Sequence, residues 1–202
     1  ADGFVTQWYD QSGNANHAVQ STPSSQPKIV DGGTLVSGGL EFDGVDDALT
    51  GANFISGSGD RSIMMAYTPA VISLGEAIMD LSSANTTGGA YTLTTEPALR
   101  CRSVTYVTTQ GVLDSPSLLS VCQSGSLIEQ DVDLYFNGSN VSRESGADGT
   151  INTEASDFQI GSGQGVFGAV SISEIIIYDS DQSGNRRAIE SDIASHYGIS
   201  GA

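Results

Sequence analysis

The sequence predicts an all-β fold, an antiparallel β-sandwich or barrel with one helix at its C-terminal end. Short segments rich in Val, Ile, Thr and aromatic residues alternate with clusters of Gly, Ser, Asn and Asp, a pattern typical of antiparallel strands joined by turns. One stretch near the end has helical periodicity instead. No internal repeat is visible, so we do not expect a propeller or solenoid.

The expected strands follow one another along nearly the whole chain. In order they are residues 4–9, 40–42, 62–67, 77–81, 91–94, 99–108, 117–123, 132–136, 158–160 and 172–178. The last segment is apolar on both faces, so we expect it to be central, between the opposite sheet and the closing helix. Glu174 interrupts it and needs a partner if buried; pairing with a turn or with Arg187 is preferred to a functional role.

The expected helix covers residues 185–197. Ile189, Ile193 and Tyr197 recur every four residues, which places them in one stripe that can lie on a sheet. Ser183 is the expected N-cap, and Gly198 the expected C-terminal stop.

The charge balance excludes two classes of partner. Lys and Arg total 7 against 24 Asp and Glu, a formal net charge of −17. Such a charge repels phosphate backbones and anionic lipid surfaces, so we expect no nucleic-acid partner. No apolar run is long enough to span a bilayer, so we expect no membrane insertion.

The two cysteines, Cys101 and Cys122, are disulfide candidates. They lie on two expected strands on either side of a turn, which predicts that they face each other on an antiparallel pair. A disulfide in an oxidising setting is preferred, and a buried thiol pair is the alternative.

Several motifs, in a consistent order, give the chain a family resemblance. Residues 8–18 (Trp-Tyr-Asp-Gln-Ser-Gly-Asn-Ala-Asn-His-Ala), 26–30 and 40–49 resemble the opening of concanavalin A-like (laminin-G-like) domains, and residues 134–138, 158–161, 173–178 and 196–199 resemble their closing part. The resemblance implies a jelly-roll sandwich of two curved antiparallel sheets. It makes residues 1–202 one such domain, which we expect to be a fragment of a longer polypeptide because the chain starts without Met.

That family includes carbohydrate-binding modules, glycoside hydrolases, and surface or phage particle proteins, and fold alone does not choose among them. The opening motif also resembles that of fungal arabinofuranosidases, but their cysteine-rich catalytic segment has no counterpart here. Glucanases of this fold carry a Glu-x-Asp-x-(x)-Glu strand, and the nearest segment, residues 129–133, ends in Asp133. The only histidines are His17 and His196, in a loop and at a helix end. We therefore expect no catalytic residues and no enzymatic activity.

Acidic residues in two loops are the metal candidates. They are Asp10, Asp43, Asp46 and Asp47. Calcium prefers several carboxylate and carbonyl oxygens from one loop, so calcium is the one cofactor we consider. The preferred interpretation is that Asp10 and Asp43 bond to their own turns, with no cofactor bound.

Sugar recognition needs aromatic platforms and planar polar groups. The ligand-binding candidates are Tyr67, Tyr91 and Tyr106 on expected strands, and Asn85 and Gln164 in Gly-rich loops. Plain hairpin connections are the preferred interpretation of those loops.

The resulting hypothesis is a non-enzymatic recognition or adhesion module that binds carbohydrate, within a phage or cell-surface structural protein. Its partner would be a glycan, a host-surface receptor or a neighbouring structural protein, and its location the virion or the cell exterior. One alternative is a purely structural particle or decoration domain without a ligand. A further alternative is a glycoside hydrolase.

Overall fold

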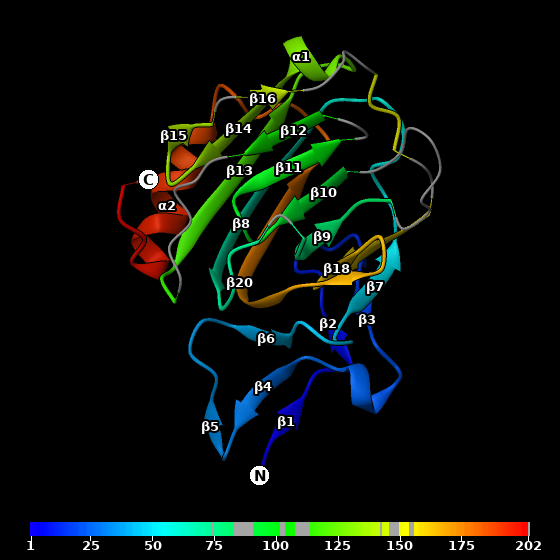
Figure 1. Ribbon diagram of the computed structural model, residues 1–202, viewed down its shortest axis with the longest axis vertical. Helices are drawn as coiled ribbons and strands as arrows, with labels where there is room; N and C mark the ends of the chain where they lie inside the picture. The colour runs from blue at the N-terminus through cyan, green and yellow to red at the C-terminus, as the bar shows by residue number, and fades with distance from the viewer. Residues whose placement is uncertain are drawn as a thin grey trace.

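The chain forms two stacked antiparallel sheets with one helix of three turns near its C-terminus (Figure 1). The computed structural model describes residues 1–73, 75–82, 91–101, 104–107, 114–141, 143–145, 150–153 and 156–201. The predicted fold class is confirmed, since antiparallel strands make up nearly all of the regular structure.

The first sheet, sheet A, has the strand order β1-β4-β6-β20-β8-β13-β14-β15, with β5 paired to β4. Its strands are β1 (Gly3–Phe4), β4 (Lys28–Asp31), β5 (Thr34–Leu35), β6 (Leu40–Asp43), β8 (Arg61–Pro69), β13 (Ser117–Gln123), β14 (Val132–Phe136), β15 (Ser139–Asn140) and β20 (Ala169–Tyr178). Strand β20, one of the last segments of the chain, is paired with β8 over nearly its full length. The longest strands therefore form the middle of this sheet.

The second sheet, sheet B, has the order β16-β12-β11-β10-β9-β17-β7-β3-β2. Its strands are β2 (Gln7–Trp8), β3 (Ala18–Val19), β7 (Leu49–Ala52), β9 (Ala77–Asp80), β10 (Tyr91–Thr94), β11 (Ala98–Cys101), β12 (Val104–Val107), β16 (Arg143–Ser145) and β17 (Asp157–Ile160). A separate hairpin, β18 (Ser162–Gly163) and β19 (Val166–Phe167), follows β17. Two short helices complete the list, η1 (Pro23–Ser25) and α1 (Ile128–Asp131).

Strand β8 explains how sheet A packs on both of its faces. Ile63, Met65 and Tyr67 belong to the core cluster between the sheets. Met64 and Ala66 point the opposite way, into a second cluster beneath the C-terminal helix. Because successive side chains of a strand alternate between faces, a strand that is apolar at every position needs both covers.

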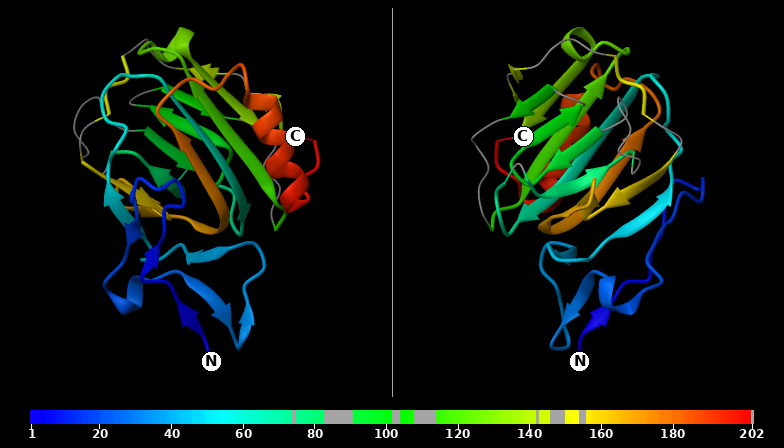
Figure 2. Two further views of the ribbon diagram at one scale, coloured as in Figure 1. Left: turned by 180° about the vertical axis from the view of Figure 1, so that it is seen from behind. Right: turned by 45° about the vertical axis from the view of Figure 1, so that its right-hand side comes forward.

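The C-terminal helix α2 (Arg186–Tyr197) is the second cover of sheet A, and from behind it lies across these strands (Figure 2). Ile193 and Ala194 are buried there, and Ile189 and Tyr197 pack against the same cluster, as the predicted stripe requires. Gly198 ends the helix in the left-handed conformation at φ 68°, which confirms the predicted stop. The N-cap is Asn185, not the expected Ser183.

One buried ion pair lies within α2, on the side that faces sheet A. Arg186 donates to the Glu190 carboxylate one turn later in the helix, and both side chains are buried. The Arg186 guanidinium also lies 3.5 Å from the ring centroid of Tyr135 on β14, a cation–π contact that joins the helix to the sheet.

No helix among the described residues is long and apolar enough to cross a membrane.

The predicted pairing of the two cysteines is wrong. Cys101 ends β11 in sheet B, whereas Cys122 lies on β13 in sheet A. Strand β11 pairs with β10 and β12, and β13 pairs with β8 and β14. Cys122 is a free thiol in the cluster beneath α2, on the face of sheet A that points away from sheet B, so the disulfide is not formed.

Candidate functional site

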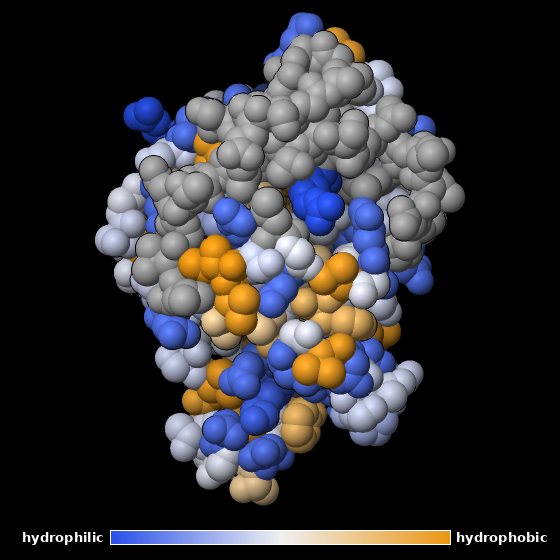
Figure 3. Space-filling view, viewed as in Figure 1, coloured by the Kyte–Doolittle hydropathy of each residue, from blue (hydrophilic) through white to orange (hydrophobic). Residues whose placement is uncertain are grey.

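A small polar pocket opens on the outer face of sheet B, where the β18–β19 hairpin folds back over the sheet. Its volume is about 140 Å³. The lining residues are Gly75, Ala77, Thr92, Thr94, Arg100, Gly163, Gln164 and Val166. Hydroxyl, amide and guanidinium groups of these residues therefore surround one concavity. Hydrophilic and hydrophobic residues lie next to one another on this side of the molecule (Figure 3).

The tip of the hairpin places Gln164 at this pocket. Gln164 and Gly165 have φ values of 52° and 79°, as expected for a two-residue hairpin turn of type I′. A positive φ is unfavourable for a side chain other than Gly or Asn, yet Gln164 adopts it. Its Nε2 donates a hydrogen bond of 3.2 Å to Oγ1 of Thr92, 72 positions earlier in the chain.

A buried carboxylate supports the floor of the pocket. Asp80 is fully buried and accepts hydrogen bonds from Oγ1 of Thr92 (3.1 Å) and from the amide of Ser82 (2.9 Å). Gly163 packs so closely that a Cβ there would lie 2.9 Å from that of Asp80. The Thr92 hydroxyl therefore donates its hydrogen to the buried Asp80. Its oxygen remains an acceptor on the pocket side, where Gln164 donates to it.

Of the two predicted ligand-binding residues whose side chains the structure describes, Tyr67 and Gln164, it brings Gln164 to this pocket. Tyr67 is a correction: its side chain is 1% exposed within the core between the sheets, because the strand period puts it on the face of Ile63 and Met65. Tyr91 pairs with Cys101, and Tyr106 with Leu99, but their side chains lie outside the described part of the chain. Asn85 also lies outside the described residues.

Sequence reasoning missed Thr92, Thr94 and Arg100 as lining residues. Thr92 and Thr94 alternate with the core residue Leu93 along β10. That period-2 pattern was the available signal, because it marks the threonines as facing outward. Arg100 is one of only seven basic residues and is exposed on β11, which was a second signal.

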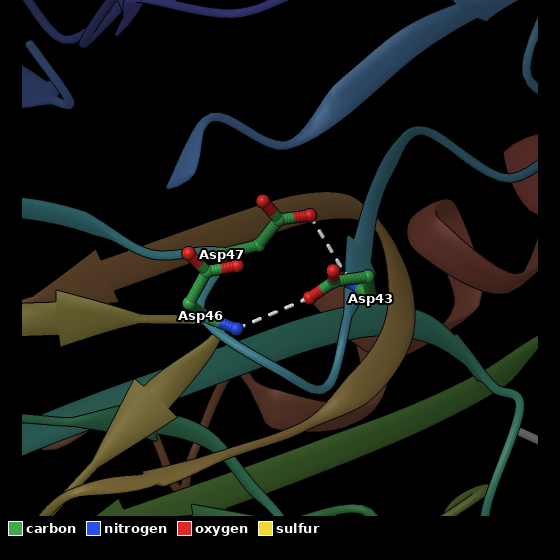
Figure 4. Close-up of side chains that lie close together, drawn as sticks. All are labelled: Asp43, Asp46 and Asp47. Atoms are coloured by element: carbon green, nitrogen blue, oxygen red, sulfur yellow. Dashed lines mark hydrogen bonds between the residues drawn. The ribbon is translucent and has the colours of Figure 1, made fainter. Parts of the chain in front are cut away.

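Three of the four predicted metal candidates come together after β6 (Figure 4). Carboxylate oxygens of Asp43, Asp46 and Asp47 lie within 4.8 Å of one another. They also bond to their own loop: Asp43 accepts from the amides of Val45 (2.8 Å) and Asp46 (3.3 Å), and Asp47 accepts from the amide of Asp43 (3.1 Å). These contacts are the turn bonds of the preferred interpretation, and calcium binding here remains a prediction.

Burial makes Asp47 the unusual member of this cluster. Its side chain is buried, and desolvation, followed by the nearby charge of Asp43, raises its pKa to about 6. Both effects disfavour the ionised form. Asp47 therefore releases its proton near pH 6, where an ordinary carboxyl group is already ionised.

Asp10 does not join the cluster. It accepts hydrogen bonds from the amides of Ser12 (2.8 Å) and Asn16 (3.0 Å) and from the Ser12 hydroxyl. The bond from the Ser12 amide is the main reason why the pKa of Asp10 is lowered. The amide of Asp10 in turn donates to Nδ1 of His17 (3.0 Å). This loop is therefore held by its own polar groups.

A larger cleft opens between the two sheets, at the edge where the N-terminal loop meets the second half of β20. Its volume is about 560 Å³. It is lined by Trp8, Tyr9, Asp10, Gln11, Ser12, Asn14, Asn16, Ala18, Phe54, Phe158, Ile160, Ser173, Glu174, Ile175, Ile176, Ile177, Asp179 and Tyr197. Glu174 contacts the Tyr197 hydroxyl, not the expected Arg187.

Several solved structures are similar to this fold. A GH54 α-L-arabinofuranosidase soaked with a cyclic sulfate inhibitor is 12% identical with a TM-score of 0.61; the match covers 96% of this chain and 51% of that one. Domain 4 of AbnA, a GH43 extracellular arabinanase from Geobacillus stearothermophilus, in complex with arabinotriose, is 12% identical with a TM-score of 0.53, covering 94% and 87%. A mutant Trypanosoma rangeli sialidase with trans-sialidase activity is 13% identical with a TM-score of 0.59, covering 96% and 32%.

No protein-family model matches the chain, and no curated protein sequence matches it either. At these identities the similarity establishes the β-sandwich fold alone, and the chain spans about half the length of the arabinofuranosidase.

The expectation that the protein is not an enzyme is contradicted, because structures that share this fold include glycoside hydrolases and sialidases. That expectation rested on three sequence observations: the incomplete glucanase strand motif, the missing cysteine-rich segment and the presence of only two histidines. Residues 129–133 do not form one strand: Glu129–Asp131 belong to α1, and β14 begins at Val132. Asp131 accepts a hydrogen bond from the amide of Leu127.

Proposed function

We propose that this chain is a carbohydrate-binding β-sandwich domain of a carbohydrate-active protein, and that the sugar binds at the pocket on sheet B. The observation that carries the proposal is the arrangement of Gln164, Thr92 and Arg100 around one concavity on an otherwise continuous sheet. The arabinotriose bound to the AbnA domain supports the ligand class.

The chemistry of the pocket suits a sugar ring. Hydroxyl groups of a sugar both donate and accept hydrogen bonds, so they need amide, hydroxyl and charged partners at fixed positions. Gln164 and Arg100 are exposed, while the Thr92 hydroxyl is held from below by Asp80. A volume of about 140 Å³ is below the roughly 300 Å³ of sites for drug-sized ligands, so it fits one ring or one side group of a glycan.

The setting belongs to the same proposal. A parent protein displayed on a virion or a cell surface would present this face to a host or cell-wall glycan, and an extracellular arabinanase among the similar structures is compatible with that. The charge of −17 supports solubility at high local copy number. Neutral sugars, and arabinose-containing oligosaccharides first, are the ligands to test.

A second candidate is glycoside hydrolysis, which the similar structures favour. It requires two carboxyl groups on either side of the scissile bond. Asp80 is one hydrogen bond away from the pocket through Thr92, so it is the first carboxyl to substitute if any substrate is cleaved.

The test is a glycan array that includes arabino-oligosaccharides and sialylated glycans, read with calcium and again with EDTA. Binding should weaken about tenfold in Gln164→Ala and in Arg100→Gln, because each removes a bond of about 1.4 kcal/mol or less. Gln130→Ala, an exposed Gln on α1, is the matched control and should bind normally. Loss of binding in EDTA alone would support a calcium requirement.

Two results would contradict the proposal. Absence of binding by a protein with a cooperative unfolding transition would favour the structural, ligand-free alternative. Binding that is unaffected by Gln164→Ala and Arg100→Gln would place the sugar elsewhere. The bound glycans should also be assayed for released sugar, since release would make the second candidate correct.

A further inference from the structure

The second half of β20 has an open edge. Strand β6 pairs only with Ala169–Ile172, while β8 pairs with β20 as far as Tyr178. Among the described residues no strand pairs with residues 175–178 on the side of β6. These residues, here called the open edge, span about 13 Å at 3.3 Å per residue. A strand in the middle of sheet A thus becomes an edge strand for half of its length.

A β-bulge marks the point where this change occurs. The register between β20 and β8 shifts between Ile172 and Glu174. At the same place Oγ of Ser173 donates to the carbonyl of Gly38 (2.7 Å), and Gly39 packs against the backbone of Ile172 and Ser173 so tightly that no Cβ would fit. The chain before β6 therefore crosses β20 at Ser173, and leaves the following residues without a neighbour.

The burial of the open edge is unusual for a core strand. Val170 and Ile172, where β6 is present, are 1% and 0% exposed. Ile175, Ile176 and Ile177 are only partly buried, although they pack against the same two clusters. Three isoleucines left partly in water next to an unpaired backbone form an incomplete core, a common mark of an interaction site.

The cleft beside the open edge has room for a strand and walls that are already fixed. Its far wall is the N-terminal loop, which Asp10 and His17 hold through their hydrogen bonds. Its floor contains Phe158 and Ile160 of sheet B. A strand placed here would continue the position of β6 next to β20, in hydrogen-bonding distance of one edge and covered by an apolar floor.

The charge of the cleft indicates what the strand would carry. Among the described residues that line the cleft none is Lys or Arg, whereas Asp10, Glu174 and Asp179 are acidic. Ile175 and Ile177 pack toward the core between the sheets, while Glu174 contacts Tyr197 of α2 on the outer side. A strand that is apolar on its inward face and basic on its outward face complements both.

We propose that the open edge of β20 binds an extended basic strand of a partner polypeptide by β-augmentation. Main-chain hydrogen bonds to residues 175–178 supply the affinity, and the inward apolar side chains complete the core against Ile175 and Ile177. A second copy of this chain is a poor occupant, since a net charge of −17 opposes self-pairing. A sugar has no row of amide groups spaced to match a strand.

The experiment uses a synthetic peptide, acetyl-(Lys-Val)₃-amide, and hydrogen–deuterium exchange of the full chain. The peptide should slow exchange at least tenfold at those amides of residues 175–178 that point away from β8, since the alternate amides already face β8. An analogue N-methylated at alternate residues on its hydrogen-bonding edge, and acetyl-(Glu-Val)₃-amide, should both leave exchange unchanged. Affinity should fall with added salt, and should fall several-fold in the double variant Glu174→Gln, Asp179→Asn.

The matched control is Asp133→Asn, on β14, which is three strands away in sheet A; it should bind the peptide as the parent does. Equal protection by the N-methylated or the acidic peptide would overturn the proposal. So would peptide binding that leaves residues 175–178 unprotected, protection by an arabino-oligosaccharide instead, or concentration-dependent self-association that protects the same residues.

Discussion

The two flanks of β20 differ in how completely they are covered. Under α2, Met64 and Leu118 are fully buried, and Ile193 of the helix is 4% exposed. At the open edge, Ile175 and Ile177 belong to the same strand as the buried Ile172 but keep contact with solvent. The residue types are alike on both flanks, so the difference comes from the neighbours.

The hydrophobic pattern of a strand shows which of its side chains must be shielded from water. It does not show whether another element of the fold is placed to shield them. Helix α2 supplies it on one flank, and the sequence of that helix already displays the matching stripe. On the other flank β6 begins only at Leu40, opposite Ile172, and the described part of the chain offers no other cover. Stability measurements on the two flanks should therefore differ.

The largest effect is expected at the buried ion pair within α2. Glu190→Ala leaves the Arg186 charge buried without its partner, which typically costs about 3–5 kcal/mol. Denaturant unfolding should record this loss. The double variant Arg186→Met, Glu190→Leu removes both charges and should regain most of it. If the double variant were as unstable as the single one, the helix would depend on the pair for more than charge compensation.

Truncation of one isoleucine on each flank should lower the free energy of unfolding by different amounts. Ile193→Ala, beneath the helix, should lower the free energy of unfolding by about 3 kcal/mol, since it removes a fully packed side chain. Ile175→Ala, at the open edge, should cost about half as much because the side chain is already partly hydrated. Equal losses would mean that the open edge is as well packed as the covered flank.

The acidic loop should show a pH effect of smaller size. Burial and the nearby Asp43 raise the pKa of Asp47 to about 6 in the folded chain, above the ordinary value of 3.8. The folded state binds this proton more tightly than the unfolded state. The stabilisation that results is fully present below about pH 4 and is lost as the pH rises through about 6. Asp47→Asn should be more stable relative to the parent at pH 7 than at pH 4. Added calcium, if it binds, should raise the stability of the parent but not of the variant.

The smallest effect is expected at the hairpin tip. Gln164→Gly relieves a positive φ at the cost of one hydrogen bond to Thr92, so stability should change by less than about 1 kcal/mol. Glycan affinity should nevertheless fall as in Gln164→Ala. A thermal melt together with the array would separate the two properties, and a fall in both would mean that the turn itself needs Gln164.

Local patterns predicted the helix and the longer strands, because each of these elements carries its own period. Two predicted strands were wrong in extent: residues 4–9 divide into β1 and β2 of different sheets, and residues 99–108 contain parts of both β11 and β12. The alternation in β8 could also have placed Tyr67 in the core, since it shares a face with Ile63 and Met65. The cysteine pairing failed because consecutive strands were assumed to form a hairpin, whereas β13 crosses to the other sheet. No local signal gives such a crossover.

The candidate pocket was predictable only in part, for a related reason. Gln164 was recognised by its residue type in a Gly-rich loop, but its contact with Thr92 depends on a hairpin that folds over a strand 72 positions away. Likewise, the sequence shows that residues 172–177 are apolar on both faces, but not that β6 begins only opposite Ile172 and leaves residues 175–178 uncovered. Contacts of this range depend on topology more than on residue type.

The buried thiol of Cys122 can report how often helix α2 detaches from sheet A. The side chain is 3% exposed and burial raises its pKa to about 11, so a thiol reagent reaches a reactive sulfur only when α2 lifts from sheet A. With Cys101 replaced by Ser, the labelling rate of the single remaining thiol, divided by that of a free cysteine, reports the fraction of time that the helix is undocked. Ligands of either candidate site can then be ranked by whether they slow that rate.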